Sequence, residues 1–160
     1  ILLDLGAETT TVAITAPQRL AFLRQFRIGA NTILRKLSDN LGMDAETVRE
    51  AIGEGMIDAA DQVRSAFEPL VRQIVLGRDY VTRRHNTRPV ELHACGGLFS
   101  APFWIKPLQT ALAIEAAVWN PLTTLPANHG ALTAELTAQG PRFAAAAGAA
   151  MAVLEEAPQR

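Results

Sequence analysis

The chain has 160 residues, of which 49% are hydrophobic and 6% aromatic, and its formal net charge at pH 7 is −1. This length is typical of one domain or of one lobe of a larger protein, and the balanced charge excludes the pronounced basic patch of a nucleic-acid-binding domain. The single cysteine excludes an internal disulfide, and no apolar run reaches the ~20 residues that span a bilayer. We therefore expect a soluble, cytoplasmic protein with no nucleic-acid partner.

The first third of the chain predicts a β-meander followed by two helices. Three segments have apolar, β-branched or alternating patterns that are typical of strands: residues 1–5, 9–15 and 20–28. A tight turn over residues 6–8 would join the first two strands. Helices are expected over 30–41, closed by Gly42, and over 45–53, capped by Asp44.

The remaining two thirds alternate helices with short strands. The strongest helical pattern covers residues 56–84, where Pro69 must bend or restart the helix because proline lacks a donor N–H. The elements expected after it are a strand over 90–95 that ends at Gly96–Gly97, a helix capped by Ser100 that runs to Leu112, a strand over 115–119, a loop to His129 and a closing helix whose Ala/Gly face permits close packing. This order indicates an α/β fold with a mixed sheet.

The turn between the first two strands combines groups that suit phosphate chemistry. Asp4 lies at the end of the first strand, and backbone N–H groups cluster around Gly6, an arrangement that can hold a metal-bound phosphate. An Asp-x-Gly turn, a Gly–Gly pair and an Ala-rich helix are each common structural features when they occur alone. Their order and spacing along this chain are more specific than any one of them.

Five segments, taken in order, resemble one known family. They are LDLGAETTTVAI, FRIGANTI, VRQIVLGRDYV, ELHACGGLFSAPFWIKPLQTALAIEAAVWNPL and FAAAAGAAMAVL. The layout resembles the second lobe of the actin-like ATPases and, among these, the PilM-like family of type IV pilus assembly. The resemblance implies an actin-like (ribonuclease H-like) α/β lobe, with a mixed sheet that begins with a three-strand β-meander and is flanked by helices. It also implies that residues 1–160 are the second, C-terminal lobe, with a small helical insertion around 43–60 and the first lobe absent.

The resemblance further implies a nucleotide site for ATP and Mg²⁺. Asp4 would hold Mg²⁺ through water, since a carboxylate suits a hard cation that keeps its hydration shell. The nucleotide-binding residues that it implies are Asp4, Gly6, Ala7, Glu8 and Thr9 around the phosphates, and Gly96, Gly97 and Leu98 at the adenosine. At most a weak ATPase is expected, and the isolated chain would be inactive.

Two departures from the family pattern weaken this site. Glu8 places a carboxylate inside the phosphate turn, where it would repel phosphate unless its side chain points to solvent. On the long helix, positions at which the family carries an Arg and a Ser facing the nucleoside align by eye with Leu76 and Gly77, so the adenosine side would be eroded. Cys95 lies in an apolar strand and is expected to be a small core residue rather than a nucleophile.

The function that the resemblance implies is that of a cytoplasmic scaffold, peripheral to the inner membrane, in type IV pilus or related secretion assembly. Its partners would be the missing first lobe and the cytoplasmic tails of bitopic inner-membrane pilus proteins, and it could form a homo-oligomer. Two alternatives stay open. One is another actin-like protein, either a cell-division FtsA relative or the cytoplasmic lobe of a type II secretion component. The other is a nucleotide-independent interaction module that keeps the fold.

Overall fold

The computed structural model of the chain describes residues 1–17, 19–124 and 133–156. Its centre is a five-stranded sheet in the order β3-β2-β1-β4-β5. The strands are β1 (Leu2–Leu5), β2 (Thr10–Ala16), β3 (Arg19–Phe26), β4 (Glu91–Cys95) and β5 (Glu115–Val118). The first three pair antiparallel as a meander, and β4 and β5 extend the sheet from β1 with parallel pairing. The predicted mixed sheet that begins with a three-strand meander is confirmed.

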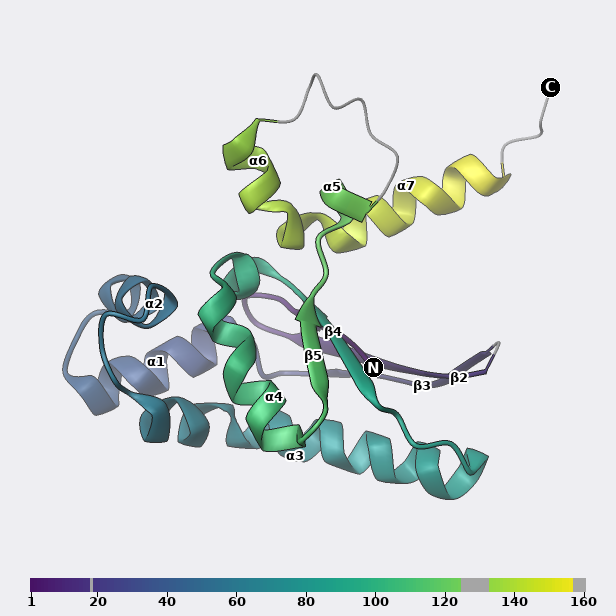
Figure 1. The fold of residues 1–160 in the computed structure, drawn as a ribbon, viewed down its shortest axis with the longest axis horizontal. Helices are drawn as coiled ribbons and strands as arrows, with labels where there is room; N and C mark the ends of the chain where they lie inside the picture. Colours follow the sequence, from purple (N-terminus) through teal and green to yellow (C-terminus); the bar gives the residue numbers. More distant parts are fainter. Residues whose placement is uncertain (18, 125–132, 157–160) are drawn as a thin grey trace.

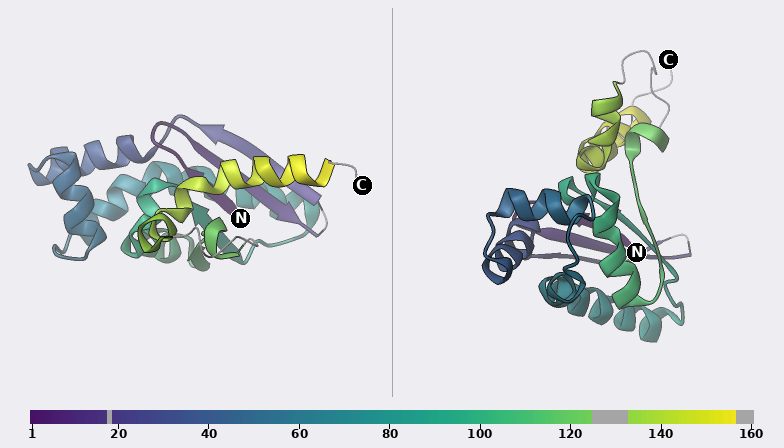
Figure 2. Two further views of the ribbon diagram at one scale, coloured as in Figure 1. Left: turned by 90° about the horizontal axis from the view of Figure 1, so that it is seen from above. Right: turned by 60° about the vertical axis from the view of Figure 1, so that its left-hand side comes forward.

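Helices cover both faces of this sheet. The α-helices of the described residues are α1 (Ala30–Leu41), α2 (Ala45–Gly53), α3 (Ala60–His85), α4 (Lys106–Leu112), α5 (Pro121–Thr124), α6 (Ala134–Ala138) and α7 (Ala144–Glu156). Short 3₁₀-helices are η1 (Gly97–Ser100), η2 (Pro102–Ile105) and η4 (Gly140–Phe143). In Figures 1 and 2, α3 lies on one side of the sheet, and α5, α6 and α7 lie on the other. The α/β architecture expected from the sequence is therefore confirmed.

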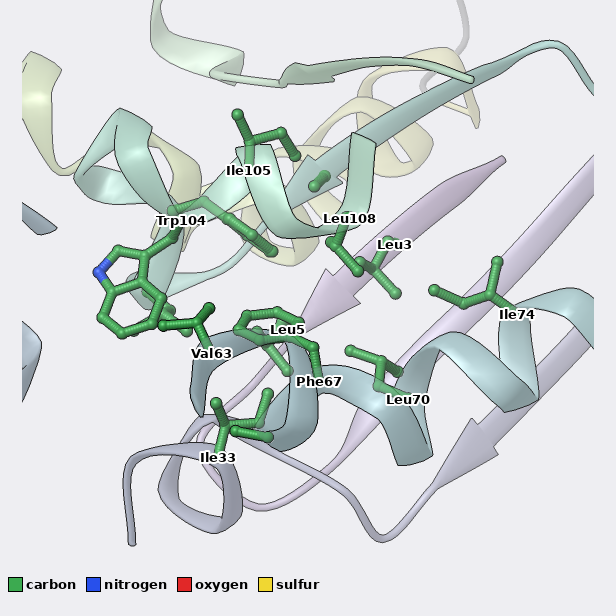
Figure 3. Close-up of a cluster of buried hydrophobic side chains, with 14 of the residues drawn as sticks. Leu3, Leu5, Ile33, Val63, Phe67, Leu70, Ile74, Trp104, Ile105 and Leu108 are labelled. Atoms are coloured by element: carbon green, nitrogen blue, oxygen red, sulfur yellow. The ribbon is translucent and has the colours of Figure 1, made fainter. Parts of the chain in front are cut away.

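The main hydrophobic core lies between the sheet and α3. Because side chains alternate along a strand, Leu3 and Leu5 of β1 share one face, and both are fully buried. The residues labelled in Figure 3 belong to this core and come from β1, α1, α3, η2 and α4: Leu3, Leu5, Ile33, Val63, Phe67, Leu70, Ile74, Trp104, Ile105 and Leu108. The core fixes β1, and with it the turn that follows β1, against the longest helix of the chain.

The ends of α1 and α2 follow the signals in the sequence. Gly42 ends α1 in the left-handed conformation, with φ of 65°, and its N–H donates to the Ser38 carbonyl oxygen. Asp44 begins α2, and its carboxylate accepts hydrogen bonds from the N–H groups of Glu46 and Thr47. These hydrogen bonds, with that from the Thr47 hydroxyl, lower the pKa of Asp44. Both predicted caps are confirmed.

Pro69 neither ends nor restarts α3, which continues as one helix from Ala60 to His85. Proline has no N–H to donate to the carbonyl four residues earlier, which here belongs to Ser65. The structure satisfies this carbonyl differently, because its oxygen accepts a hydrogen bond of 2.6 Å from Nζ of Lys36 on α1. Of the two predicted effects, a bend or a restart, the restart is wrong, and a bond from a neighbouring helix takes the place of the missing backbone bond.

The connection after β4 also differs from the prediction. Ser100 does not cap a helix: its Oγ is buried and has no hydrogen-bond partner among the described residues. Ala101 occupies the extended position before η2 instead, and Pro102 opens this 3₁₀-helix, where its missing N–H costs nothing. The α-helix proper begins only at Lys106. The interruption places Trp104 inside the core.

The segment after β5 contains more helix than the sequence predicts. Where a loop to His129 was expected, α5 covers Pro121–Thr124, and His129 itself lies outside the described residues. Asn120 organises this region, because its Nδ2 donates to the Thr137 carbonyl and its Oδ1 accepts from Leu122 N–H. Gly140 packs against it so closely that a Cβ there would lie 2.6 Å from the Asn120 Nδ2.

The closing helix α7 exposes most of its surface. A Cβ built on Gly148 would meet nothing within 4 Å, so the helix is open to solvent at this position, whereas Ala144 at its start is buried. Met151, Val153 and Leu154 on this helix are 40%, 69% and 74% exposed. No helix in the described part of the chain is long and apolar enough to cross a membrane.

The burial pattern of α3 gives a direct test of the core. Leu70 is fully buried, whereas Leu76 on the same helix is 57% exposed. We expect Leu70→Ala to lower the free energy of unfolding by about 2–5 kcal/mol, because it removes buried apolar contacts and leaves a cavity. Leu76→Ala is the matched control and should stay within about 0.5 kcal/mol. Urea denaturation followed by circular dichroism measures both, and equal losses would contradict this core.

Candidate phosphate-binding cavity

The turn between β1 and β2 is held in place by the start of α1. Within the turn, the N–H of Gly6 donates to the Thr9 carbonyl at 2.9 Å. The carbonyl oxygens of Gly6 and Ala7 accept hydrogen bonds, each of 2.9 Å, from the N–H groups of Ala30 and Asn31. The first N–H groups of α1 therefore bind the turn itself, which fixes its position relative to the helix.

The same turn keeps a row of backbone donors unpaired. The N–H groups of Ala7, Glu8 and Thr9 have no acceptor among the described residues. The Glu8 side chain is exposed, and its carboxylate accepts a hydrogen bond of 2.7 Å from the Asn31 Nδ2. Consecutive free N–H groups in a tight turn form a concave donor site that suits an anion.

The Gly96–Gly97 turn after β4 lies beside the end of β1. Gly96 has φ of +117°, and a Cβ there would lie 2.8 Å from the carbonyl carbon of Leu5, so the site accepts only glycine. Its N–H donates to the Pro141 carbonyl at 2.8 Å. The lack of a side chain at Gly96 thus allows β4 and the end of β1 to approach each other closely. Gly97, in contrast, contacts the side chain of Arg142.

These two turns open onto one cavity of about 630 Å³. Its lining residues come from both turns, from the start of α1, from α2 and from η4: Leu5, Gly6, Ala7, Glu8, Ala30, Asn31, Thr32, Leu34, Arg35, Ala45, Glu46, Arg49, Gly97, Leu98 and Arg142. The cavity therefore brings together five of the nucleotide-site residues predicted from the sequence: Gly6, Ala7, Glu8, Gly97 and Leu98. Thr9, Gly96 and Asp4 do not line it.

A smaller cavity adjoins the first between α2 and the Gly–Gly turn. Its volume is about 240 Å³, and it shares Glu46, Arg49, Gly97 and Leu98 with the larger cavity. Glu50 of α2 and Glu54, the residue after this helix, also line the smaller cavity. The two cavities therefore adjoin at the Gly–Gly turn, through Gly97 and Leu98.

Three arginines in the larger cavity were missed by the sequence analysis. Arg35 lies on α1, Arg49 on α2 and Arg142 in η4, so more than 100 residues separate the first from the last. The pairing of Arg49 with Glu46, at 3.3 Å, is an ordinary feature of a helix surface. No local pattern marks these side chains as one group, because only tertiary packing brings their elements together.

Two solved structures share this architecture. The chain matches a chain of the PilM–PilN type IV pilus biogenesis complex with a TM-score of 0.72 at 20% identity, covering 94% of this chain and 44% of that one. The apo psk41 ParM protein matches with a TM-score of 0.53 at 9% identity, covering 97% of this chain and 42% of that one. The chain has the actin-like fold.

At these identities the likeness is one of fold, and it confirms the actin-like lobe and the likeness to PilM that the sequence predicts. The chain spans less than half the length of either neighbour. No protein-family model matches the sequence. No curated protein matches it either.

Asp4, which the PilM-like resemblance assigns to Mg²⁺, faces away from the large cavity. It shares the sheet face opposite the core with Thr11 and Cys95, which are its register partners on β2 and β4. A separate cavity of about 200 Å³ lies on this face and is closed by Trp119 and the start of α7. No cluster of three or more metal-ligating side chains occurs among the described residues. Asp4 is thus a single carboxylate in a mainly apolar setting.

Cys95 has the character of a core residue, as predicted. It is 7% exposed, and its thiol donates to the Leu3 carbonyl oxygen at 3.4 Å. Burial, together with the nearby Asp4 carboxylate, raises the pKa of the Cys95 thiol to about 12. A thiol with its pKa raised in this way is protonated at neutral pH, as is typical of a buried structural cysteine.

The two α3 positions that were aligned by eye with the nucleoside side do not line the large cavity. Leu76 lies on the exposed side of α3, and neither it nor Gly77 lines the large cavity. Gly77 instead packs under β2 and β3, where a Cβ would lie 2.9 Å from the Phe22 ring. The expected erosion of the adenosine side stays a prediction.

Gly96 offers a test of how the two turns meet. We expect Gly96→Ala to lower the midpoint of thermal unfolding by several degrees, because the new Cβ collides with the end of β1 and the backbone is strained. Gly148→Ala is the matched control in open space on α7, and it should be neutral or stabilising by up to about 1 kcal/mol. Scanning calorimetry measures both variants, and an unchanged midpoint for Gly96→Ala would contradict the close approach.

Proposed function

We propose that the large cavity binds a nucleotide, with ATP as the ligand class, at the second lobe of an actin-like protein. The observation that carries this proposal is the convergence of the β1–β2 turn and the Gly–Gly turn on one cavity of about 630 Å³. The fold of actin-like ATPases supports nucleotide binding in general. Asp4 does not line this cavity, so we assign no Mg²⁺ to the residues that line it.

The phosphates would lie against the β1–β2 turn. The unpaired N–H groups of Ala7, Glu8 and Thr9 supply donors, and the Asn31 amide holds the Glu8 carboxylate by a hydrogen bond. A fixed row of N–H groups binds an anion without the entropy cost of ordering side chains. In this arrangement, the backbone of the turn contacts the ligand, and its side chains do not have to.

The nucleoside would extend along the Gly–Gly turn into the smaller cavity. Gly97 and Leu98 line both cavities, so they lie where the phosphate and nucleoside ends would meet. The carboxylates of Glu50 and Glu54, which line the smaller cavity, are acceptors suited to ribose hydroxyls. Two adjoining cavities therefore suit a ligand with two chemically different parts better than a single small anion.

We further propose that the chain is the C-terminal lobe of a PilM-like scaffold at the inner membrane. This proposal is supported by the match to a chain of the PilM–PilN type IV pilus biogenesis complex, of which the present chain covers 44%. The proposed partners are the first lobe and the cytoplasmic tails of bitopic pilus proteins. Residues 43–60, which carry α2, would be the small helical insertion of this lobe. Catalysis would need the other lobe, so the chain alone would bind without turnover.

A nucleotide-independent interaction module is the second candidate, and the exposed apolar surface of α7 favours it. Met151 and Leu154 lie one turn apart on this helix and are 40% and 74% exposed. Exposed apolar helix surface of this kind is typical of a contact with another protein or lobe. This candidate needs only the fold and places no ligand in the cavity.

Calorimetric titration of Mg·ATP tests the nucleotide proposal in the longest natural polypeptide that carries these residues. We expect saturable binding that Ala7→Asp weakens at least about tenfold, because a carboxylate on the exposed turn repels the phosphates. Ala111→Asp, on the exposed side of α4, is the matched control and should bind as wild type does. Absence of saturable binding in the wild type would overturn the nucleotide proposal and favour the interaction module.

The exposed α7 surface leads to a prediction on association. Because Met151 and Leu154 present apolar area to water, we expect the isolated chain to self-associate as its concentration rises. Met151→Lys combined with Leu154→Lys should restore a monomer, whereas the control Ala152→Lys, also exposed on α7, should have a smaller effect. Sedimentation velocity over a wide concentration range measures this, and a strictly monomeric wild-type chain would contradict it.

A further inference from the structure

We infer that three arginines, Arg35, Arg49 and Arg142, hold the phosphate chain of the ligand by their guanidinium groups. They enter the large cavity from three separate elements, α1, α2 and η4. This inference rests on the proposed nucleotide function and deepens it, because it names the groups that supply positive charge. The ligand class it requires is a chain of two or more phosphates rather than a neutral nucleoside.

Arg142 is built into the wall of the cavity. Its Nε would lie 3.1 Å from a Cβ on Gly97, so the side chain passes directly over the Gly–Gly turn. The preceding residue, Pro141, accepts the hydrogen bond of 2.8 Å from Gly96 N–H and anchors η4 to the same turn. The one polar contact of the Arg142 guanidinium among the described residues is a long one, 3.3 Å, to Oε1 of Gln139. Its donors therefore remain available to a ligand.

Arg35 and Arg49 line the same cavity from α1 and α2. Arg35 has no ion pair or hydrogen bond to any described side chain. Arg49 is partly buried, with 34% of its side chain exposed, and contacts Glu46 at 3.3 Å and 3.5 Å. A contact this long, between i and i+3 on a helix surface, is weak and open to exchange for a phosphate.

The charged side chains that line the cavity are three arginines and two glutamates, so the cations outnumber the carboxylates by one. The Glu8 carboxylate accepts a hydrogen bond from the Asn31 amide, and Glu46 pairs with Arg49. Asp4 lies on the opposite sheet face with Cys95 and does not line this cavity. A guanidinium group can donate two parallel hydrogen bonds to the oxygens of one phosphate, and it keeps its positive charge at any physiological pH. The counter-charge for the phosphates thus comes from the protein itself.

The test compares ligands by phosphate number in the presence of EDTA, using the longest natural polypeptide that carries these residues. Calorimetry would follow ATP, ADP, AMP and inorganic tripolyphosphate binding to the wild type, to Arg142→Gln and to Arg35→Gln. We expect ATP and tripolyphosphate to bind without metal, and AMP to bind at least about tenfold more weakly. Each variant should lose about tenfold for ATP and little for AMP, with an unchanged thermal midpoint.

Arg72→Gln is the matched control, because Arg72 is an exposed α3 arginine paired with Glu68 at 2.7 Å, far from the cavity lining. It should bind every ligand as the wild type does. If ATP binds only with Mg²⁺ and equally well to wild type and both variants, the inference is overturned while the nucleotide proposal stands. If tripolyphosphate binds in an arginine-dependent way and ATP does not, the arginine site stands and the nucleotide proposal falls.

Discussion

The structure depends on the close approach of backbone segments at one end of β1. Gly96 lies against the Leu5 carbonyl, and Gly29 lies so near the β1–β2 turn that a Cβ would be 2.5 Å from the carbonyl carbons of Ala7 and Glu8. Hydrogen bonds then fix the turn to the start of α1, and the Gly–Gly turn to Pro141. Without side chains at these positions, three distant segments meet closely enough to enclose a cavity. Backbone packing therefore determines where the cavity lies, and the side chains around it determine the chemistry of its lining.

Strand alternation divides the chemistry of β1 between two sides of the sheet. Leu3 and Leu5 point to the core, which holds the strand rigidly, and Asp4 points to the face closed by α7. The turn beyond Leu5 leaves the sheet and faces α1 and α2 instead. Asp4 and Gly6, two residues apart in the sequence, thus line two different surfaces of the protein. Adjacency of Asp4 and Gly6 in the chain does not place their functional groups in one cavity.

Much of the fold could be predicted because its signals are local. The β-branched run of β2, the Asp44 cap and the left-handed Gly42 each depend on a few neighbouring residues. The uninterrupted α3 could not be predicted, since the Lys36 side chain that satisfies the Ser65 carbonyl lies on another helix. The same holds for Gly77: a shift of one residue along a helix turns a side chain by about 100°, so an alignment by eye cannot decide which face meets a ligand.

The candidate site shows the same limit more strongly. The turns could be predicted, because glycines and a strand end mark them, whereas the arginines could not, because α1, α2 and η4 meet only in the folded chain. Arg142 also links two features that the sequence treats as separate. It lies over Gly97, and two residues later the exposed helix α7 begins. The short segment η4 therefore belongs both to the cavity wall and to the base of the apolar helix.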